Sequence, residues 1–206
     1  MSTAAIIGPR ITGVARKVPT WPVYVLGLLP PAWLLYQGIT GGLGVDPVKV
    51  MEHQLGLWAL QLLLVGLCIT PLMRIARINL LKFRRALGVL AFLYILFHLT
   101  VWLVLDIQLR WGEIWADIVK RPYITVGMAA FVLATPLVAT SWDGAVRRLG
   151  PVVWRKLHKL TYVIVLLGAV HFVMQEKVWT PESLIYLTLA VLLVGYRLAP
   201  GRMVRA

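Results

Sequence analysis

The sequence has little cysteine and few acidic side chains. Its single cysteine, Cys68, lies in an apolar run, so internal disulfides and cysteine-based zinc or iron–sulfur sites are excluded. Only 14% of residues are charged, against about 25% in soluble domains. No low-complexity run occurs, which argues against a disordered or fibrous protein. No Walker motif, dinucleotide fingerprint or hydrolase elbow is present, so any nucleotide chemistry must come from another protein.

Apolar residues are abundant instead, at 60% of the chain with a mean hydropathy of +0.81. Six apolar stretches have roughly the length that spans a bilayer. They fall at about 22–39, 55–73, 86–105, 123–141, 157–174 and 184–198. The first follows a basic tail and has no small-residue cleavage site after it, so it reads as a retained anchor. These features predict an all-α polytopic membrane protein, with 1–206 forming a single integral membrane domain of six transmembrane helices.

The basic residues are distributed unevenly between the two sides of this predicted bundle. With the N-terminus in the cytoplasm, 16 of the 21 Lys and Arg residues lie on the inner side and seven of the eight acids lie outside. The inner side is then +15 and the outer side −2, which follows the positive-inside rule. Both termini are therefore predicted to be cytoplasmic. The basic excess reflects topology, and nucleic acid is not an expected partner.

Two of the four histidines lie deep inside predicted spans. His98 is 12 residues above the inner end of the third span, which is about 18 Å into a core about 30 Å thick. His171 is 14 residues above the inner end of the fifth span, or about 21 Å. The rings therefore share one level, in the outer half of the membrane. Two neutral imidazoles at one depth can ligate a haem iron from both faces, and the alternative is a hydrogen bond from each ring to a neighbouring helix.

The other two histidines lie near the predicted boundaries. His158 is about 20 Å below His171, and the third span offers only Arg84 and Arg85 as partners at that depth. His158 could ligate a second haem with an unusual partner, contact a flavin or quinone head group, or lie in the membrane interface. His53 opens the second span on the outer side. It could be solvated, or it could contact a haem propionate or a docked partner.

A basic cluster precedes the third span and includes Arg84 and Arg85. It fits the topology signal, and its guanidinium groups could also bind haem propionates, a flavin phosphate or membrane lipid.

Several short segments along the chain carry a family resemblance. They are the sequence GGLGVDPVK at 41–49 with His53 after it, Ile69-Thr70-Pro71-Leu72, Arg84-Arg85 with Leu87-Gly88, His98-Leu99-Thr100, Arg121-Pro122-Tyr123, Leu157-His158 and Val170-His171-Phe172. Together they resemble the MsrQ (YedZ) family, the haem-binding membrane subunits of bacterial methionine sulfoxide reductase systems. That family is similar to the ferric reductase-like transmembrane proteins. The resemblance covers nearly the whole chain and implies a six-transmembrane-helix bundle of the ferric reductase-like type.

The resemblance also implies cofactors, partners and an activity. It implies haem b, with His98, His158 and His171 as ligand candidates, and bound FMN. It implies electrons from the quinone pool, taken from a quinol, and delivery to a periplasmic molybdopterin-containing methionine sulfoxide reductase that repairs oxidised proteins. Arg84 and Arg85 depart from the two-haem oxidases, which argues against a symmetrical inner haem.

We therefore expect a haem b electron-transfer subunit in the bacterial inner membrane, with sulfoxide reduction itself carried out by the partner. The sequence leaves two rival functions open. One is a transporter that uses intramembrane histidines, although the core lacks the acidic partners that proton relays usually need. The other is a structural anchor for an enzyme complex.

Overall fold

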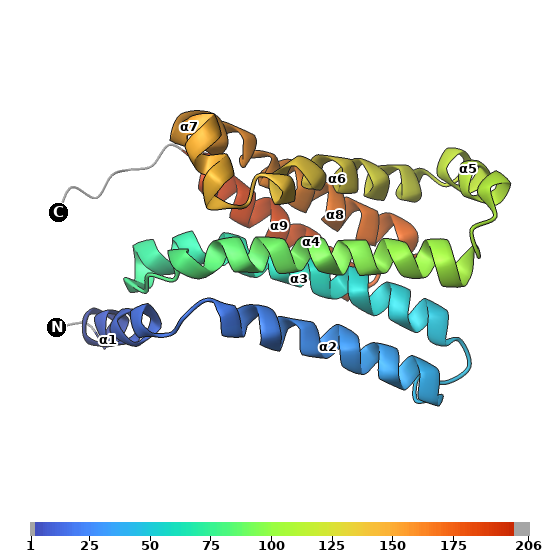
Figure 1. The fold of residues 1–206 in the computed structure, drawn as a ribbon, viewed down its shortest axis with the longest axis horizontal. Helices are drawn as coiled ribbons and strands as arrows, with labels where there is room; N and C mark the ends of the chain where they lie inside the picture. Colours follow the sequence, from blue (N-terminus) through green and yellow to red (C-terminus); the bar gives the residue numbers. More distant parts are fainter. Residues whose placement is uncertain (1–2, 200–206) are drawn as a thin grey trace.

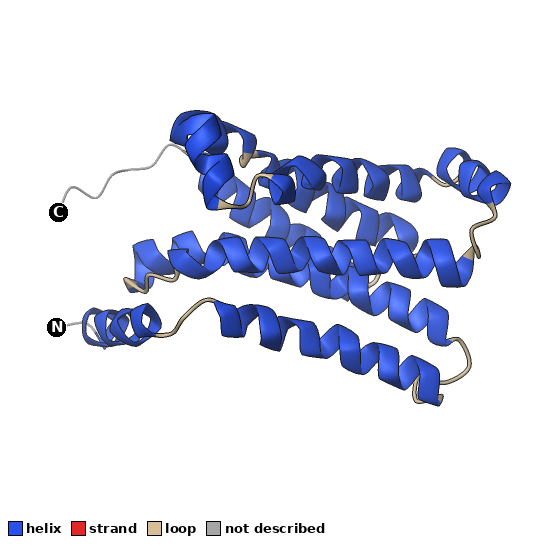
Figure 2. Ribbon diagram, viewed as in Figure 1, coloured by secondary structure: helices blue, strands red, loops and turns tan. Residues whose placement is uncertain are grey.

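The computed structural model describes residues 3–199, and every regular element among them is helical (Figure 2). The elements are α1 (Thr3–Lys17), α2 (Trp21–Thr40), α3 (Pro47–Ala76), the short 3₁₀ turn η1 (Leu81–Phe83), α4 (Arg84–Thr100), the π-helical segment η2 (Val101–Asp106), α5 (Trp111–Lys120), α6 (Pro122–Ala139), α7 (Asp143–Leu157), α8 (Leu160–Gln175) and α9 (Pro181–Leu198). The long helices run side by side along one axis (Figure 1). We call one end of the bundle the α5 end and the opposite end the α7 end.

The described residues contain five or six candidate membrane spans, in the order that the sequence predicts. Among the described residues, α2, α3, α4 with its π-helical continuation, α6 and α9 are each long and apolar enough to cross a membrane. A sixth candidate is α8 taken together with α7, which meets it at a bend of 44°. The six predicted spans fall on α2, α3, α4, α6, α8 and α9. The chain is therefore an all-α polytopic membrane protein.

Two of the helices begin at other residues than the predicted spans do. The second span, predicted from residue 55, belongs to a helix that begins at Pro47, because the Asp46 side chain accepts a hydrogen bond from the Lys49 backbone N–H and caps the first turn. His53 consequently lies inside α3 and does not open it. The helix that carries the fifth predicted span begins at Leu160 and not at residue 157, because α7 occupies the chain up to Leu157.

Three short helices were not predicted. α1 packs beside the α3–α4 connection, where the Thr12 hydroxyl donates to the Arg77 carbonyl and Lys82 Nζ donates to the Arg16 carbonyl at 2.9 Å. α5 buries Ile114 against the bundle. α7 is kinked at Gly150, whose φ of 74° and ψ of 152° suit only glycine. All three helices are amphipathic, and a search for long apolar windows does not detect amphipathic helices.

The centre of the bundle is a ring of four helices. α3 packs against α4, α4 against α6, α6 against α8, and α8 back against α3. Small buried residues such as Ala59, Ala91 and Ala169 allow the helices to approach closely. α2 covers α3 and α4, whereas α9 covers α3 and α8. α4 and α8 therefore lie diagonally across the ring, and these are the helices that carry His98 and His171.

Candidate functional site: a histidine pair in one of two cavities

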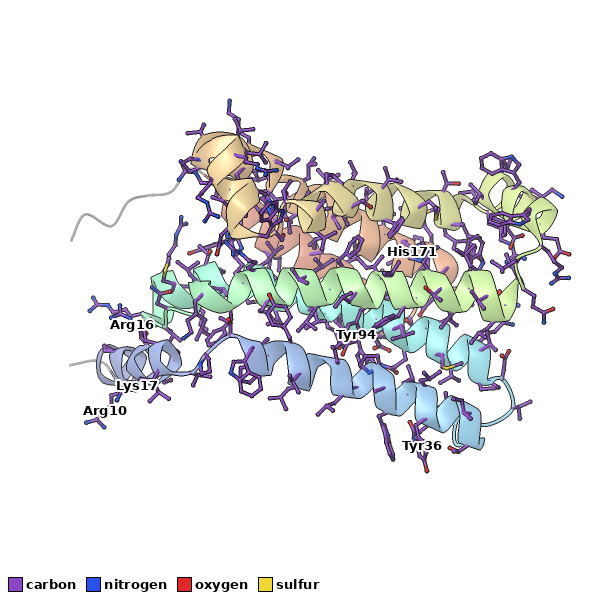
Figure 3. All side chains as sticks on the ribbon, in the orientation of Figure 1. Arg10, Arg16, Lys17, Tyr36, Tyr94 and His171 are labelled. Carbon is purple, nitrogen blue, oxygen red and sulfur yellow. The ribbon has the colours of Figure 1, made fainter. Side chains whose placement is uncertain are left out.

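His98 and His171 face each other inside the ring. His98 comes from the last turn of α4 and His171 from α8, and their ring centroids are 6.1 Å apart with the planes at 81°. Figure 3 shows His171 in the space between α4 and the layer formed by α6 and α8. Both rings line a cavity of about 390 Å³ towards the α5 end of the bundle. The structure thus brings together the two histidines that the depth count places at one level.

Each ring is held by a backbone carbonyl on the neighbouring helix. His98 Nδ1 lies 2.8 Å from the carbonyl oxygen of Glu52 on α3, and His171 Nδ1 lies 2.7 Å from that of Tyr123 on α6. A carbonyl can only accept, so Nδ1 carries the proton in both rings. Nε2 of each neutral ring is then left with its lone pair, the state in which imidazole binds a metal.

The two imidazoles suit a metal ion whose other ligands come from a cofactor and not from the protein. A metal–imidazole bond is about 2 Å long, so two imidazoles on opposite sides of one ion have ring centres roughly 6 Å apart. The observed 6.1 Å meets this requirement. No group of three or more His, Cys, Asp or Glu able to hold a metal occurs within residues 3–199, whereas a zinc site needs three or four protein ligands. A haem iron needs only two from the protein.

The cavity between these histidines has apolar walls and a polar rim. Glycines at 56, 127 and 168 line it together with aliphatic side chains. Charged residues also line it, and they are Lys49, Glu52, Asp106, Arg121 and Glu176. The Arg121 guanidinium donates to the Tyr123 hydroxyl at 3.3 Å, which raises the pKa of Arg121 further and keeps it cationic. The lining therefore combines an apolar slot with two cations and three acids, and the two cations, Lys49 and Arg121, are the groups that could meet the carboxylates of a macrocycle.

A second cavity of about 720 Å³ lies towards the α7 end. Its lining is strongly basic and includes Lys82, Arg84, Arg85, Arg155 and Lys159. Aromatic rings from four helices also line it, and they are Tyr24, Phe92, Trp154 and Tyr162. Such a combination suits a ligand with an anionic group and a flat ring system.

His158 belongs to this second cavity. Its ring stacks on Trp154 with centroids 3.9 Å apart, and its Nε2 lies 3.1 Å from the Thr140 hydroxyl oxygen. It is the only histidine among the described residues that line this cavity. The residues present therefore do not supply the two imidazoles that a second bis-histidine haem would need.

Comparison with known proteins gives the chain a family. Residues 55–169 match the family model described as "Ferric reductase like transmembrane component". The chain is 49% identical to the protein-methionine-sulfoxide reductase heme-binding subunit MsrQ of Agrobacterium fabrum, over 92% of this chain and 88% of that protein. It is 48% identical to the MsrQ of Rhizobium meliloti (90% and 85%) and 47% identical to that of Brucella ovis (87% and 81%). The chain belongs to the MsrQ family. No solved structure matches it.

The matched domain of this MsrQ-family chain covers only part of the site. Its range of 55–169 includes His98 and His158 but ends two residues before His171. The MsrQ relatives cover 87–92% of the chain, so the resemblance extends well beyond that domain.

Three further predicted site residues differ in their surroundings. His53 lines the first cavity and is exposed, with its ring 5.6 Å from that of Phe172. Arg85 donates from Nη1 to the Asp143 carboxylate at 2.5 Å. Arg84 lines the second cavity and forms no ion pair with a described carboxylate. In this MsrQ-family chain, Arg84 is therefore the better placed of the two arginines to meet an anionic ligand.

Sequence reasoning missed four contributors to the histidine site. They are the carbonyls of Glu52 and Tyr123 and the glycines Gly56 and Gly127, and each glycine lies directly beside one histidine ring. Each glycine follows its carbonyl residue by four positions, which is one helical turn. This repeated spacing could have pointed to the two histidine contacts. It does so only when α3 is known to pack on α4 and α6 on α8.

Proposed function

We propose that this chain is a haem b-binding electron-transfer subunit of a methionine sulfoxide reductase system. The observation that carries the proposal is the His98–His171 pair, with both Nδ1 atoms bound to carbonyls and the ring centres 6.1 Å apart. The haem would supply a one-electron carrier within the membrane. His98 and His171 would hold its iron, while the Lys49 and Arg121 cations would meet its carboxylates at the rim. The relatives are named as haem-binding subunits, which supports the same function.

The second cavity is proposed to bind FMN. Arg84 and the other cations around it fit the phosphate, because guanidinium and phosphate form charge-assisted hydrogen bonds. Trp154 and Tyr162 offer aromatic faces for the ring system. A flavin fits this lining better than a second haem because only His158 is there to act as an axial ligand.

The two cavities are separated by a thin apolar wall. Leu63, Ile95 and Ile164 line both cavities, and Phe92 of the second stacks on Phe131 of the first at 5.8 Å between centroids. Cofactors placed in the two cavities would thus be close enough for electron transfer through side chains alone. His98 and His171 would hold the haem on the α5 side of this wall.

The proposed orientation puts the α7 end in the cytoplasm and the α5 end in the periplasm of the bacterial inner membrane. The +15 and −2 charges of the two ends support this. Electrons from a quinol in the bilayer would leave at the α5 end, towards a periplasmic molybdopterin-containing reductase. Two of the outer acids offer little unpaired charge for docking, since Glu113 pairs with Arg110 at 2.9 Å and Asp117 with Arg121 at 3.3 Å.

Spectra of the purified protein test the proposal. A pyridine haemochrome assay should give about one haem b for each chain, and the dithionite-reduced protein should show a low-spin b-type spectrum. Acid extraction followed by chromatography should release FMN. A folded, monodisperse protein that stays colourless after growth with ample haem would overturn the haem proposal, and the transporter and anchor functions would then be the ones to test.

The direction of transfer needs a separate test. In oriented vesicles, haem reduced by a quinol analogue should reoxidise when the periplasmic reductase and methionine sulfoxide are added on the α5 side. Reoxidation no faster than without the reductase, or only with reductase on the α7 side, would contradict the outward route.

A further inference from the structure

Two glycines occupy equivalent places beside the two histidines. A Cβ built on Gly127 would lie 2.9 Å from both Cε1 and Nδ1 of His171. A Cβ built on Gly56 would lie 3.2 Å from Nδ1 of His98 and 3.4 Å from its Cε1. The first distance is shorter than real Cβ atoms show, and the second is tighter than most. An alanine at either position would push on the imidazole itself.

The helix geometry explains why glycine stands at these two places. In an α-helix the carbonyl of residue i points towards residue i+4. Gly56 is four residues after Glu52, and Gly127 is four residues after Tyr123, so each glycine lies beside the carbonyl that accepts from a histidine. A side chain there would stand between the ring and that carbonyl. Lack of a Cβ lets each imidazole approach the helix backbone to within 2.8 Å.

The two contacts are equivalent across the ring of helices. α3 supplies a carbonyl and a glycine to His98 of α4, and α6 supplies a carbonyl and a glycine to His171 of α8. We propose that Gly56 and Gly127 are positioning residues that allow both Nδ1–H groups to bond helix carbonyls, and that they thereby set the haem affinity and the reduction potential. The inference rests on the proposed haem function.

The physical effect runs through the ligand nitrogen. A histidine that donates from Nδ1 is fixed in one tautomer and orientation, and its Nε2 is more basic. A more basic ligand favours ferric over ferrous iron, so these hydrogen bonds lower the reduction potential. Loss of such a partner typically weakens metal binding by about 10–100-fold. Displacing either ring should therefore weaken haem binding and raise the potential of the haem that remains.

The test compares Gly127→Ala and Gly56→Ala with two matched glycine variants. Gly195→Ala places a methyl in open space on α9. Gly27→Ala places one against Leu90 Cδ1, which disturbs the packing of α2 on α4 without meeting a histidine. The measurements are haem per chain, the haem dissociation constant, the ferric spin state and a spectroelectrochemical midpoint potential. Far-UV circular dichroism and size-exclusion chromatography check folding.

We expect Gly127→Ala to raise the haem dissociation constant about 10–100-fold, to add a high-spin fraction and to raise the midpoint potential. Gly56→Ala should change the same quantities in the same direction by less, because its Cβ intrudes less. Gly195→Ala should match the wild type. Gly27→Ala should lower thermal stability and leave the potential unchanged. A shift in potential separates positioning from packing, since a packing defect lowers haem content without moving the potential of the retained haem.

The outcomes separate this inference from the proposed function. If the wild type binds no low-spin haem, the proposed function fails. If the wild type does bind it, and both histidine-facing variants keep the potential and spin state of Gly195→Ala, the inference fails and the function stands. Should Gly127→Ala not fold, Gly56→Ala decides, because its 3.2 Å contact requires the ring to move only a few tenths of an ångström.

Discussion

At the scale of single residues, three of the four histidines differ in what holds their Nδ1 and Nε2 atoms. His98 and His171 donate from Nδ1 to backbone and leave Nε2 for a metal, whereas Nε2 of His158 is paired with Thr140. We expect His98→Ala and His171→Ala each to remove the low-spin haem, because one imidazole cannot fill both axial positions. His53→Ala should retain most haem. Pyridine haemochrome assays on the three variants check this, and an unchanged low-spin spectrum in His98→Ala or His171→Ala would remove that residue as a ligand.

Arg84 and Arg85 form a matched pair for the second cavity. Arg85 is engaged with Asp143, so Arg84 should contribute more to an anionic ligand. Arg84→Gln is expected to weaken FMN binding about 10-fold or more, since a hydrogen bond to a charged group contributes about 1.5–3 kcal/mol. Arg85→Gln should have a smaller effect. Fluorescence titration of flavin-depleted protein measures both, and equal affinity in wild type and Arg84→Gln would place the phosphate elsewhere.

At the scale of elements, the kink in α7 links backbone conformation to the second cavity. Gly150 adopts a φ/ψ combination that costs other residues about 1–3 kcal/mol. The turn directs the second half of α7, which carries Trp154 and ends just before His158, to the cavity. Gly150→Ala should therefore lower FMN content and the thermal midpoint of the protein, while the haem bound to His98 and His171 stays. Loss of haem in parallel with flavin would show that α7 supports the whole bundle and not this cavity alone.

The sequence predicted the long helices better than the short ones. Apolar length alone locates α2, α3, α4, α6, α8 and α9, and counting residues along α4 and α8 places His98 and His171 at one level. Counting cannot show which helices are neighbours, so it missed the contacts of Gly56 and Gly127. It also cannot detect amphipathic helices such as α1 and α5, whose apolar residues are too few for a window average.

At the scale of the whole molecule, the charge difference between the two ends predicts the orientation. Cys68 is the only cysteine, so Cys68→Ser provides a background for single-cysteine labelling. In intact cells, Lys120→Cys at the α5 end should react with a membrane-impermeant maleimide, and Lys17→Cys at the α7 end should react only after lysis. The opposite pattern would reverse the orientation and, with it, the direction of electron transfer.

The relative angle of the two imidazole planes offers the most direct test of the central claim that His98 and His171 ligate one haem. Nearly perpendicular axial imidazoles leave two iron d orbitals close in energy, which gives a strongly anisotropic low-spin ferric signal in electron paramagnetic resonance. Parallel imidazoles give an ordinary rhombic signal. With the planes at 81°, we predict the strongly anisotropic signal in the wild type and its loss in both alanine variants. A purely high-spin signal, or a low-spin signal that survives in either variant, would contradict the claim that both histidines ligate one haem. A rhombic signal that is lost in both variants would contradict only the angle of 81° between the ring planes.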